Sequence, residues 1–316
     1  MKNPFSAIYG AVTGGRNRFY DHGVLSARRL RGSVVSVGNI AAGGAGKTPF
    51  VIALGELLKK RGVSFDVLSR GYKRKSKGVT LVDPDGSPRD FGDEPLLIAR
   101  RLEVSVIVGE NRYEAGWIAE ENFGPRLHLL DDGFQHRRLA RDLDIVLVTP
   151  NDAKDRLMPA GRLREALPAI QRADVVVLTN DMTTEGLPLT HQKIWRVRRG
   201  IVAPQATGPC VAFCGIAQPE NFFAQLRASG VTLAGTRAFR DHHWYGASDV
   251  RELLALRKKS GATWFATTEK DAINLGGLIA KLEPTHVVAV TMQIENADAI
   301  VNSLLATIAA RNHRPA

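Results

Sequence analysis

Short runs of apolar residues alternate with longer amphipathic stretches through the first two thirds of the chain. The runs predict strands at residues 34–37, 65–69, 104–108, 127–130, 145–148 and 175–179. The stretches between them predict helices at residues 48–61, 94–101 and 112–121. Several runs are apolar without interruption, which is typical of strands buried on both faces of a parallel sheet. The pattern predicts a doubly wound α/β domain of the P-loop type, with ligands at the carboxyl ends of its strands.

A second, smaller βα series begins at residue 209. Its predicted strands cover residues 211–214, 231–239, 263–267 and 286–290, and its predicted helices cover residues 220–229, 247–260 and 297–311. We therefore expect a core domain at residues 26–190, an inter-domain linker at residues 191–208 and a smaller α/β domain at residues 209–316. The polar segment 73–90, rich in turn formers, is expected to form a basic loop and a hairpin.

Residues 1–25 form a separate N-terminal segment with apolar side chains near helical spacing, namely Phe5, Ile8, Tyr9 and Val12. Arginines follow, among them Arg16 and Arg18. Such a segment can lie on an anionic membrane surface, or it can pack as a helix on the core of its own protein. The sequence leaves both open. It shows no signal peptide and no apolar stretch near the ~20 residues that span a bilayer.

A glycine-rich loop stands between the first predicted strand and the first predicted helix. It consists of Gly43, Gly44, Ala45, Gly46, Lys47 and Thr48. Glycines let backbone N–H groups close around a phosphate, lysine neutralises the β- and γ-oxygens, and the threonine hydroxyl ligates Mg²⁺. Ala41 stands where the usual motif has its first glycine. A glycine-rich turn without a nucleotide is the alternative, and the strand–loop–helix context argues against it. We expect the loop to bind a nucleoside triphosphate.

Asp131 and Asp132 follow the predicted strand 127–130 directly. Two adjacent carboxylates at the end of a buried strand need a balancing cation, and P-loop enzymes present acidic groups to Mg²⁺ at this place. The alternative is a loop of Asx turns. We expect Mg²⁺ to be held by Thr48 together with one or both aspartates.

Four other motifs are ambiguous from local sequence alone. Asp93 and Glu94, before Pro95, can be caps of the following helix. His242 and His243 can be ligands, a base or a polar loop. The segments 268–271 and 156–164 can be a helix N-terminus and a solvated basic face.

The overall charge is +11, from 43 Lys and Arg against 32 Asp and Glu. This excess favours an anionic partner, which can be a nucleic acid, an acidic lipid surface or a phosphorylated substrate. The two cysteines, Cys210 and Cys214, have no further metal ligands at a useful spacing, and we expect them to be buried thiols.

The motifs occur together in a fixed order that closely resembles the tetraacyldisaccharide 4′-kinase family of the lipid A pathway in Gram-negative bacteria. They are Val37-Gly38-Asn39, the glycine-rich loop, Ser69-Arg70-Gly71-Tyr72, Gly92-Asp93-Glu94-Pro95, Asp131-Asp132-Gly133-Phe134-Gln135-His136, Gly161-Arg162-Leu163-Arg164-Glu165, Asp241-His242 and Thr268-Glu269-Lys270-Asp271. The resemblance covers most of the chain. Ala41 matches the family's own pattern, whereas Lys73 departs from it.

The resemblance implies phosphorylation of the 4′-hydroxyl of a tetraacylated glucosamine disaccharide 1-phosphate by Mg-ATP, at the cytoplasmic face of the inner membrane. It also implies that the smaller domain closes over the site. By resemblance, Asp93 is the general base, His242 orients it, and Lys47 holds the phosphates. Further contacts to the sugar or phosphates are implied for Glu94, Gln135, His136, Arg164 and Glu165.

Two other classes of protein are alternatives to this hypothesis. A regulatory or partitioning P-loop ATPase often carries lysine where this chain has Ala42. A nucleic-acid-binding protein is disfavoured because the chain lacks zinc spacing, an RNA-binding aromatic signature and a recognition helix. We expect a monomer that binds an acylated disaccharide phosphate and an anionic membrane surface, and no nucleic acid.

Overall fold

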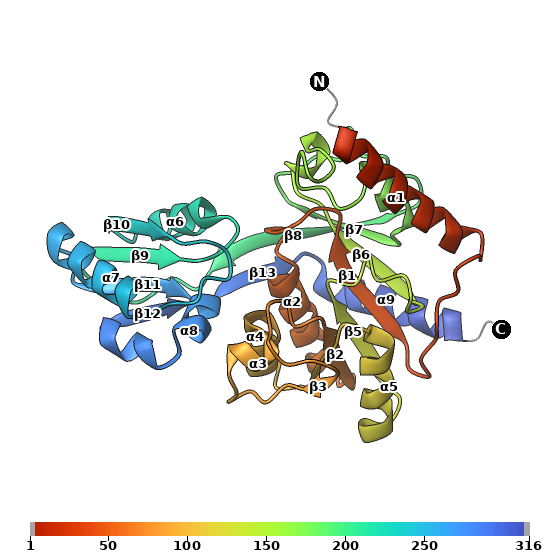
Figure 1. The fold of residues 1–316 in the computed structure, drawn as a ribbon, viewed down its shortest axis with the longest axis horizontal. Coiled ribbons are helices and arrows are strands. Elements are labelled where there is room, and N and C mark those ends of the chain that lie inside the picture. Colours follow the sequence, from red (N-terminus) through yellow and green to blue (C-terminus); the bar gives the residue numbers. More distant parts are fainter. Residues whose placement is uncertain (1–3, 313–316) are drawn as a thin grey trace.

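The computed structural model describes residues 4–312, which fold around two sheets of different size. Figure 1 shows the smaller sheet standing to one side of the larger, with β8 and β13 leading between the two. Within the described residues the larger sheet has nine strands and the smaller has four.

The large sheet is parallel except at its two edges, in the order β13-β8-β7-β6-β1-β5-β2-β4-β3. β13 and β3 are the antiparallel edge strands. Its members are β1 (Val34–Asn39), β2 (Phe65–Ser69), β3 (Thr80–Leu81), β4 (Val106–Val108), β5 (Leu127–Asp131), β6 (Leu143–Leu147), β7 (Val175–Thr179), β8 (Lys193–Ile201) and β13 (Val290–Ile294). Because β1 pairs with β5 in parallel, with Val37 opposite Asp131, the loops that follow these two strands leave the same edge of the sheet.

Alternate residues of the central strands face two different apolar clusters, one on each side of the sheet. Because both faces are buried, the sequences of these strands are unbroken apolar runs. Val35 and Ile145 pack with Phe50 on one face, and Val146 packs with Phe134 on the other. The helices of this domain are α1 (Pro4–Asp21), α2 (Lys47–Lys60), α3 (Pro88–Phe91), α4 (Asp93–Leu102), α5 (Arg112–Phe123) and α9 (Ala297–Asn312).

The smaller domain is built on a four-stranded parallel sheet, in the order β10-β9-β11-β12. Its strands are β9 (Cys210–Cys214), β10 (Leu233–Ala238), β11 (Trp264–Thr268) and β12 (Thr285–Val288). Its α-helices are α6 (Pro219–Ala228), α7 (Ala247–Ser260) and α8 (Glu269–Leu275). The thiols of Cys210 and Cys214 are buried in its core.

Most predicted elements end within two residues of the observed ones, but three segments differ. Residues 193–201, expected in a linker, form β8 of the large sheet, with Trp195 and Val197 packed into its core. The predicted strand 286–290 is two strands, β12 and β13, which belong to different sheets. Consequently β13 and α9, expected in the smaller domain, complete the larger one.

The third difference is in the segment 73–90, where the expected local hairpin is absent. β3 pairs instead with the distant strand β4, and the segment ends in the short helix α3. Ser87 caps α3, because its side chain accepts a hydrogen bond from the N–H of Arg89.

Helix α1 lies on the surface of the large domain and buries none of its residues. Polar contacts attach it, among them a hydrogen bond from the Tyr9 hydroxyl to the Arg164 carbonyl at 3.1 Å. Phe5, Ile8 and Val12 are 61–68% exposed, so α1 is not a core helix. No helix among residues 4–312 is long and apolar enough to cross a bilayer.

A charged cluster is buried inside the large domain, beneath α5. The ring of His128 contacts Asp66 through Nδ1 at 2.7 Å and Glu120 through Nε2 at 3.2 Å. Burial alone would lower the pKa of His128, but the two carboxylates outweigh burial and raise it. The cluster therefore favours the protonated ring.

Candidate active site

The glycine-rich loop joins β1 to α2 at the carboxyl edge of the large sheet. Gly43, Gly44 and Gly46 have φ values of 74°, 59° and 83°, a conformation that glycine adopts without a steric penalty. Gly46 is the N-cap of α2, so Lys47 is the first residue of that helix. The loop thus presents backbone amides at a helix N-terminus, which is the arrangement that binds phosphate.

Lys47 turns back toward the end of β1. Its Nζ donates to Asn39 Oδ1 at 3.1 Å and lies 3.4 Å from Asp132 Oδ1. Arg164 forms a two-pronged pair with the same Asp132 carboxylate, at 2.7 and 2.9 Å. Despite partial burial, these two cations hold the pKa of Asp132 well below its usual range. Asp132 is therefore ionised beside the phosphate loop.

Asp131, the neighbouring aspartate, lies in a different environment. It is 2% exposed, and its Oδ2 accepts a hydrogen bond from Ser69 at 3.3 Å. Its Oδ1 is buried with no hydrogen-bond partner among the described residues. Burial and the carboxylates of Glu94 and Asp132 raise the pKa of Asp131 to about 7, against the effect of Lys47.

These residues fit a divalent cation. The unpartnered oxygen of Asp131, the ionised Asp132 and the hydroxyl of Thr48 are hard oxygen donors of the kind that Mg²⁺ takes, with phosphate oxygens and water filling the other positions. A cation there would also balance the two adjacent carboxylates. Within residues 4–312, no group of three or more His, Cys, Asp or Glu side chains is arranged to hold a metal ion by itself.

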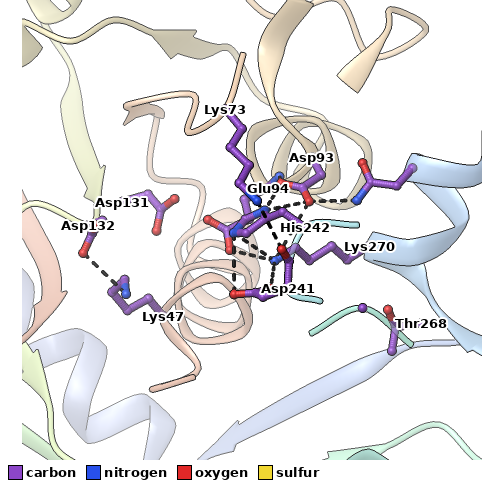
Figure 2. Close-up of polar contacts among 12 residues, drawn as sticks. Lys47, Lys73, Asp93, Glu94, Asp131, Asp132, Asp241, His242, Thr268 and Lys270 are labelled. Carbon is purple, nitrogen blue, oxygen red and sulfur yellow. Dashed lines mark hydrogen bonds and ion pairs between the residues drawn. The ribbon is translucent and has the colours of Figure 1, made fainter. Parts of the chain in front are cut away.

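Asp93 begins α4 and meets two side chains from the smaller domain (Figure 2). The Nδ1 atom of His242 lies 2.9 Å from both Asp93 oxygens, and Asn274 donates to Oδ2 at 2.9 Å. Burial alone would raise the pKa of Asp93, but the His242 hydrogen bond, the charge of Lys270 and the Asn274 hydrogen bond lower it to about 2. Asp93 is therefore an ionised, buried carboxylate.

The two neighbouring histidines differ in their contacts. His243 contacts Asp249 through Nε2 at 3.1 Å. His242 has a φ of 57°, a left-handed conformation that is uncommon outside glycine and is often found at functional sites. The structure therefore distinguishes two residues that the sequence left ambiguous.

The structure brings together only some of the residues that were predicted to contact the sugar or the phosphates. Glu94 lies beside Asp93 and accepts a hydrogen bond from Lys270 at 3.4 Å, and Gln135 donates to the Asn39 carbonyl at 2.9 Å. His136 lies close to Arg112; burial and nearby arginines, Arg112 foremost, lower the pKa of His136 to about 4. Glu165 instead pairs with Arg172 at 2.8 Å, and Asn17 of α1 donates to it. Its contacts join α1 to the domain.

Several residues of this region had no role in the sequence-based prediction. Lys270 and Asn274 come from α8. The sequence indicated Lys270 only as a member of the motif at residues 268–271, and it gave no signal for Asn274. Arg199 of β8 donates to the carbonyl of Ala45 in the phosphate loop, and its Nε is buried without a partner among the described residues. No local signal marked Arg199, because its strand resembled a linker.

The smaller domain also covers the phosphate loop. A Cβ atom at Gly44 would come within 2.8 Å of Nε2 of Gln218, the N-cap residue of α6. The loop, the aspartate pair and the Asp93–His242 pair thus lie where the two domains meet. This arrangement can hold a triphosphate and a divalent cation beside a buried carboxylate–imidazole pair, and phosphoryl transfer to a hydroxyl uses groups of these kinds.

Comparisons with known proteins agree with this chemistry. The family model described as tetraacyldisaccharide-1-P 4′-kinase matches residues 2–309. A tetraacyldisaccharide 4′-kinase of Koribacter versatilis is 47% identical, over 98% of this chain and 99% of the relative. One of Aquifex aeolicus is 39% identical, over 87% of this chain and 89% of the relative. The crystal structure of LpxK from Aquifex aeolicus in complex with ATP has a TM-score of 0.77 at 34% identity, covering 96% of this chain and 98% of that one.

Proposed function

The chain belongs to the tetraacyldisaccharide-1-phosphate 4′-kinase family, and we propose that it carries out the reaction of that family through Asp93 and His242. It is a kinase of lipid A biosynthesis that uses ATP and Mg²⁺. The γ-phosphate of ATP is transferred to the 4′-hydroxyl of tetraacyldisaccharide 1-phosphate. A regulatory or partitioning ATPase is not favoured by these relatives.

The phosphates of ATP are held by the amides of residues 43–48 and by the ammonium of Lys47. Thr48, Asp131 and Asp132 are the residues that would hold Mg²⁺, which, when bound, neutralises charge on the β- and γ-phosphate oxygens. The ion pair between Lys47 and Asp132 orients the lysine. Arg164 keeps the same carboxylate ionised.

Asp93 accepts the proton of the sugar hydroxyl. As the 4′-oxygen bonds to the γ-phosphorus, the bond from that phosphorus to the β,γ-bridging oxygen breaks, and the hydroxyl proton moves to Asp93. His242 donates from Nδ1 to the carboxylate and sets its orientation. The observation that carries this proposal is the 2.9 Å contact between Asp93 and His242, because the pair forms only when both domains are in place.

The substrate's acyl chains and phosphate suggest where the enzyme works. Ile8 and Val12 of α1 are 61% and 67% exposed, and the whole chain carries a charge of +11. An apolar helix face beside basic side chains binds the surface of an anionic bilayer. We propose that the protein is peripheral on the cytoplasmic face of the inner membrane, and that it acts as a monomer.

The reaction is tested by transfer of labelled γ-phosphate from Mg-ATP to tetraacyldisaccharide 1-phosphate in detergent micelles. We expect rapid product formation by the wild type and a loss of about 10²- to 10⁴-fold for Asp93→Asn, the range of general base catalysis. Equal rates for both proteins would remove Asp93 as the base and leave the kinase. Absence of product from a folded wild type that binds ATP would refute the kinase assignment.

The membrane proposal is tested by flotation with vesicles that contain phosphatidylglycerol. The double variant Ile8→Asp and Val12→Asp should lose binding, whereas Val202→Asp, which changes another exposed apolar side chain, should keep it. Equal flotation of the two variants would contradict a role for α1.

A further inference from the structure

Helix α8 of the smaller domain packs on α4, the helix that begins at Asp93 (Figure 1). Polar contacts join the two helices at two places. At the first residue of α4, Asp93 accepts a hydrogen bond from Asn274 of α8 at 2.9 Å. In the last turn of α4, Nη1 of Arg101 donates to both carboxylate oxygens of Glu269, the first residue of α8, at 3.0 and 3.1 Å. The smaller domain is thus attached near both ends of α4.

The guanidinium of Arg101 also reaches a third helix. Its Nη2 donates to Glu56 at 3.1 Å, and Glu56 belongs to α2, the helix that follows the phosphate loop. Burial alone would lower the pKa of Arg101, but Glu269 and Glu56 outweigh burial and raise the pKa. The attraction to the two carboxylates therefore exceeds the cost of burying the charge. One cation joins the phosphate-loop helix, the helix of Asp93 and the smaller domain.

The apolar contact between α4 and α8 does not fix their orientation. Ile273 of α8 is 6% exposed and lies in the apolar cluster of the large domain, together with Leu96 and Ala99 of α4. Apolar burial is non-directional, so it holds α8 against α4 and still permits α8 to slide or rotate. Hydrogen bonds weaken steeply with distance and angle. The polar contacts therefore decide where α8 lies on α4.

The contact between Asn274 and Asp93 cannot fix that orientation by itself. A single contact leaves α8 free to pivot about it. Asp93 and Arg101 are separated by about 12 Å along the axis of α4, at a rise of 1.5 Å per residue. A second contact at that separation removes the pivot. Arg101 is also too far from Asp93 to touch the reacting groups.

We propose that Arg101 and Glu269 are positioning residues, which hold α8 in the orientation that brings Asn274 to Asp93. Their side chains are 26% and 22% exposed, so the pair is partly shielded from solvent ions. The pair orients the smaller domain on the helix that carries the base, and through Glu56 it ties that orientation to the phosphate-loop helix. This inference rests on the proposed function, since it takes Asp93 as the base.

The test is a double-mutant cycle on kcat in the phosphate-transfer assay. Arg101→Gln and Glu269→Gln should each lower kcat by about 3- to 10-fold, with the KM for ATP unchanged. Because both changes remove the same contact, the double variant should be no slower than Arg101→Gln alone. Effects that multiply in the double variant, or wild-type kcat in both single variants, would overturn the proposal.

Glu252→Gln is the matched control. It removes an ion pair with Arg237 at 2.7 Å that lies within the smaller domain and does not join the two domains. Its kcat should equal that of the wild type. A loss as large as that of Glu269→Gln would show that removing any ion pair of the smaller domain slows the enzyme, and it would overturn the specific role of Arg101 and Glu269.

Pulsed EPR gives a second readout that does not require an active variant. Spin labels are attached through Asn122→Cys on α5 and Lys259→Cys on α7, two exposed positions, whereas the native thiols are buried. With Mg²⁺ and a non-hydrolysable ATP analogue present, we expect Glu269→Gln to broaden or shift the distribution of distances between the labels. An unchanged distribution would overturn the proposal. A wild type that transfers no phosphate would refute the proposed function instead, and the EPR distances would still decide whether the pair orients α8.

Discussion

The contact between Asp93 and His242 makes a quantitative prediction for a double-mutant cycle. The two side chains are 5% and 11% exposed, and Nδ1 lies 2.9 Å from each carboxylate oxygen. A hydrogen bond to a charged group contributes about 1.5–3 kcal/mol, which corresponds to roughly 10- to 150-fold in rate. If His242 acts only through Asp93, His242→Gln should lower kcat by about this factor.

The double variant separates a coupled pair from two independent residues. Asp93→Asn removes the proton acceptor and should cost about 10²- to 10⁴-fold. Once the acceptor is gone, the orienting residue has nothing to orient, so the double variant should be no slower than Asp93→Asn alone. The readout is kcat for transfer of labelled phosphate to the disaccharide, at saturating ATP and acceptor.

His243→Gln is the control, because His243 contacts Asp249 and not Asp93. It should retain wild-type kcat. The reasoning is refuted if the effects of the two single variants multiply in the double variant, since this would show that His242 acts on the reaction independently of Asp93. It is also refuted if His243→Gln is as slow as His242→Gln.

Three further outcomes follow from the structure. Arg199→Gln removes the donor to the phosphate loop and should raise the KM for ATP about 3- to 10-fold in initial-rate assays. Arg198→Gln, which changes an exposed arginine, should leave this KM unchanged. The same KM for ATP in both variants would show that Arg199 has no role in nucleotide binding. Because the pKa of His128 is raised on folding, its contribution to stability is present at low pH and is lost as pH rises through the raised value. Urea unfolding at a series of pH values should show a cost of His128→Gln that is largest in acid and shrinks as the pH rises, and a cost that is the same at every pH would contradict the cluster. Asp132 has a φ of 55°, a left-handed conformation that asparagine tolerates better than alanine. In thermal unfolding, Asp132→Ala should therefore be about 1 kcal/mol less stable than Asp132→Asn, and both variants should lose activity. Equal stabilities of the two variants would argue against backbone strain at this residue.

Local sequence predicted most of the elements because short-range physics determines them. Apolar runs bounded by turn formers predicted β2 and β7 at their observed residues, and the glycine-rich loop predicted the start of α2 within one residue. β8 was missed because its arginines and lysine made a strand of the large sheet resemble a polar linker. Which sheet β13 joins depends on a partner almost a hundred residues away, and no local pattern contains that information.

The candidate site likewise has a part that local sequence predicted and a part that depends on contacts between distant segments. The phosphate loop and the two aspartates lie in single stretches of chain, next to the strands that place them, so the sequence by itself determined that this protein binds a nucleotide. The order of all its motifs along the chain, which resembles that of the disaccharide kinases, determined the family. Local sequence did not separate His242 from His243, and only the family resemblance favoured His242. The tertiary structure shows His242 in contact with Asp93 across 149 positions, and it alone decided that Lys270 and Asn274 join them. The physical reason is that a proton acceptor acquires its charge and orientation from burial and from neighbours on other elements, which exist only after the two domains have packed together.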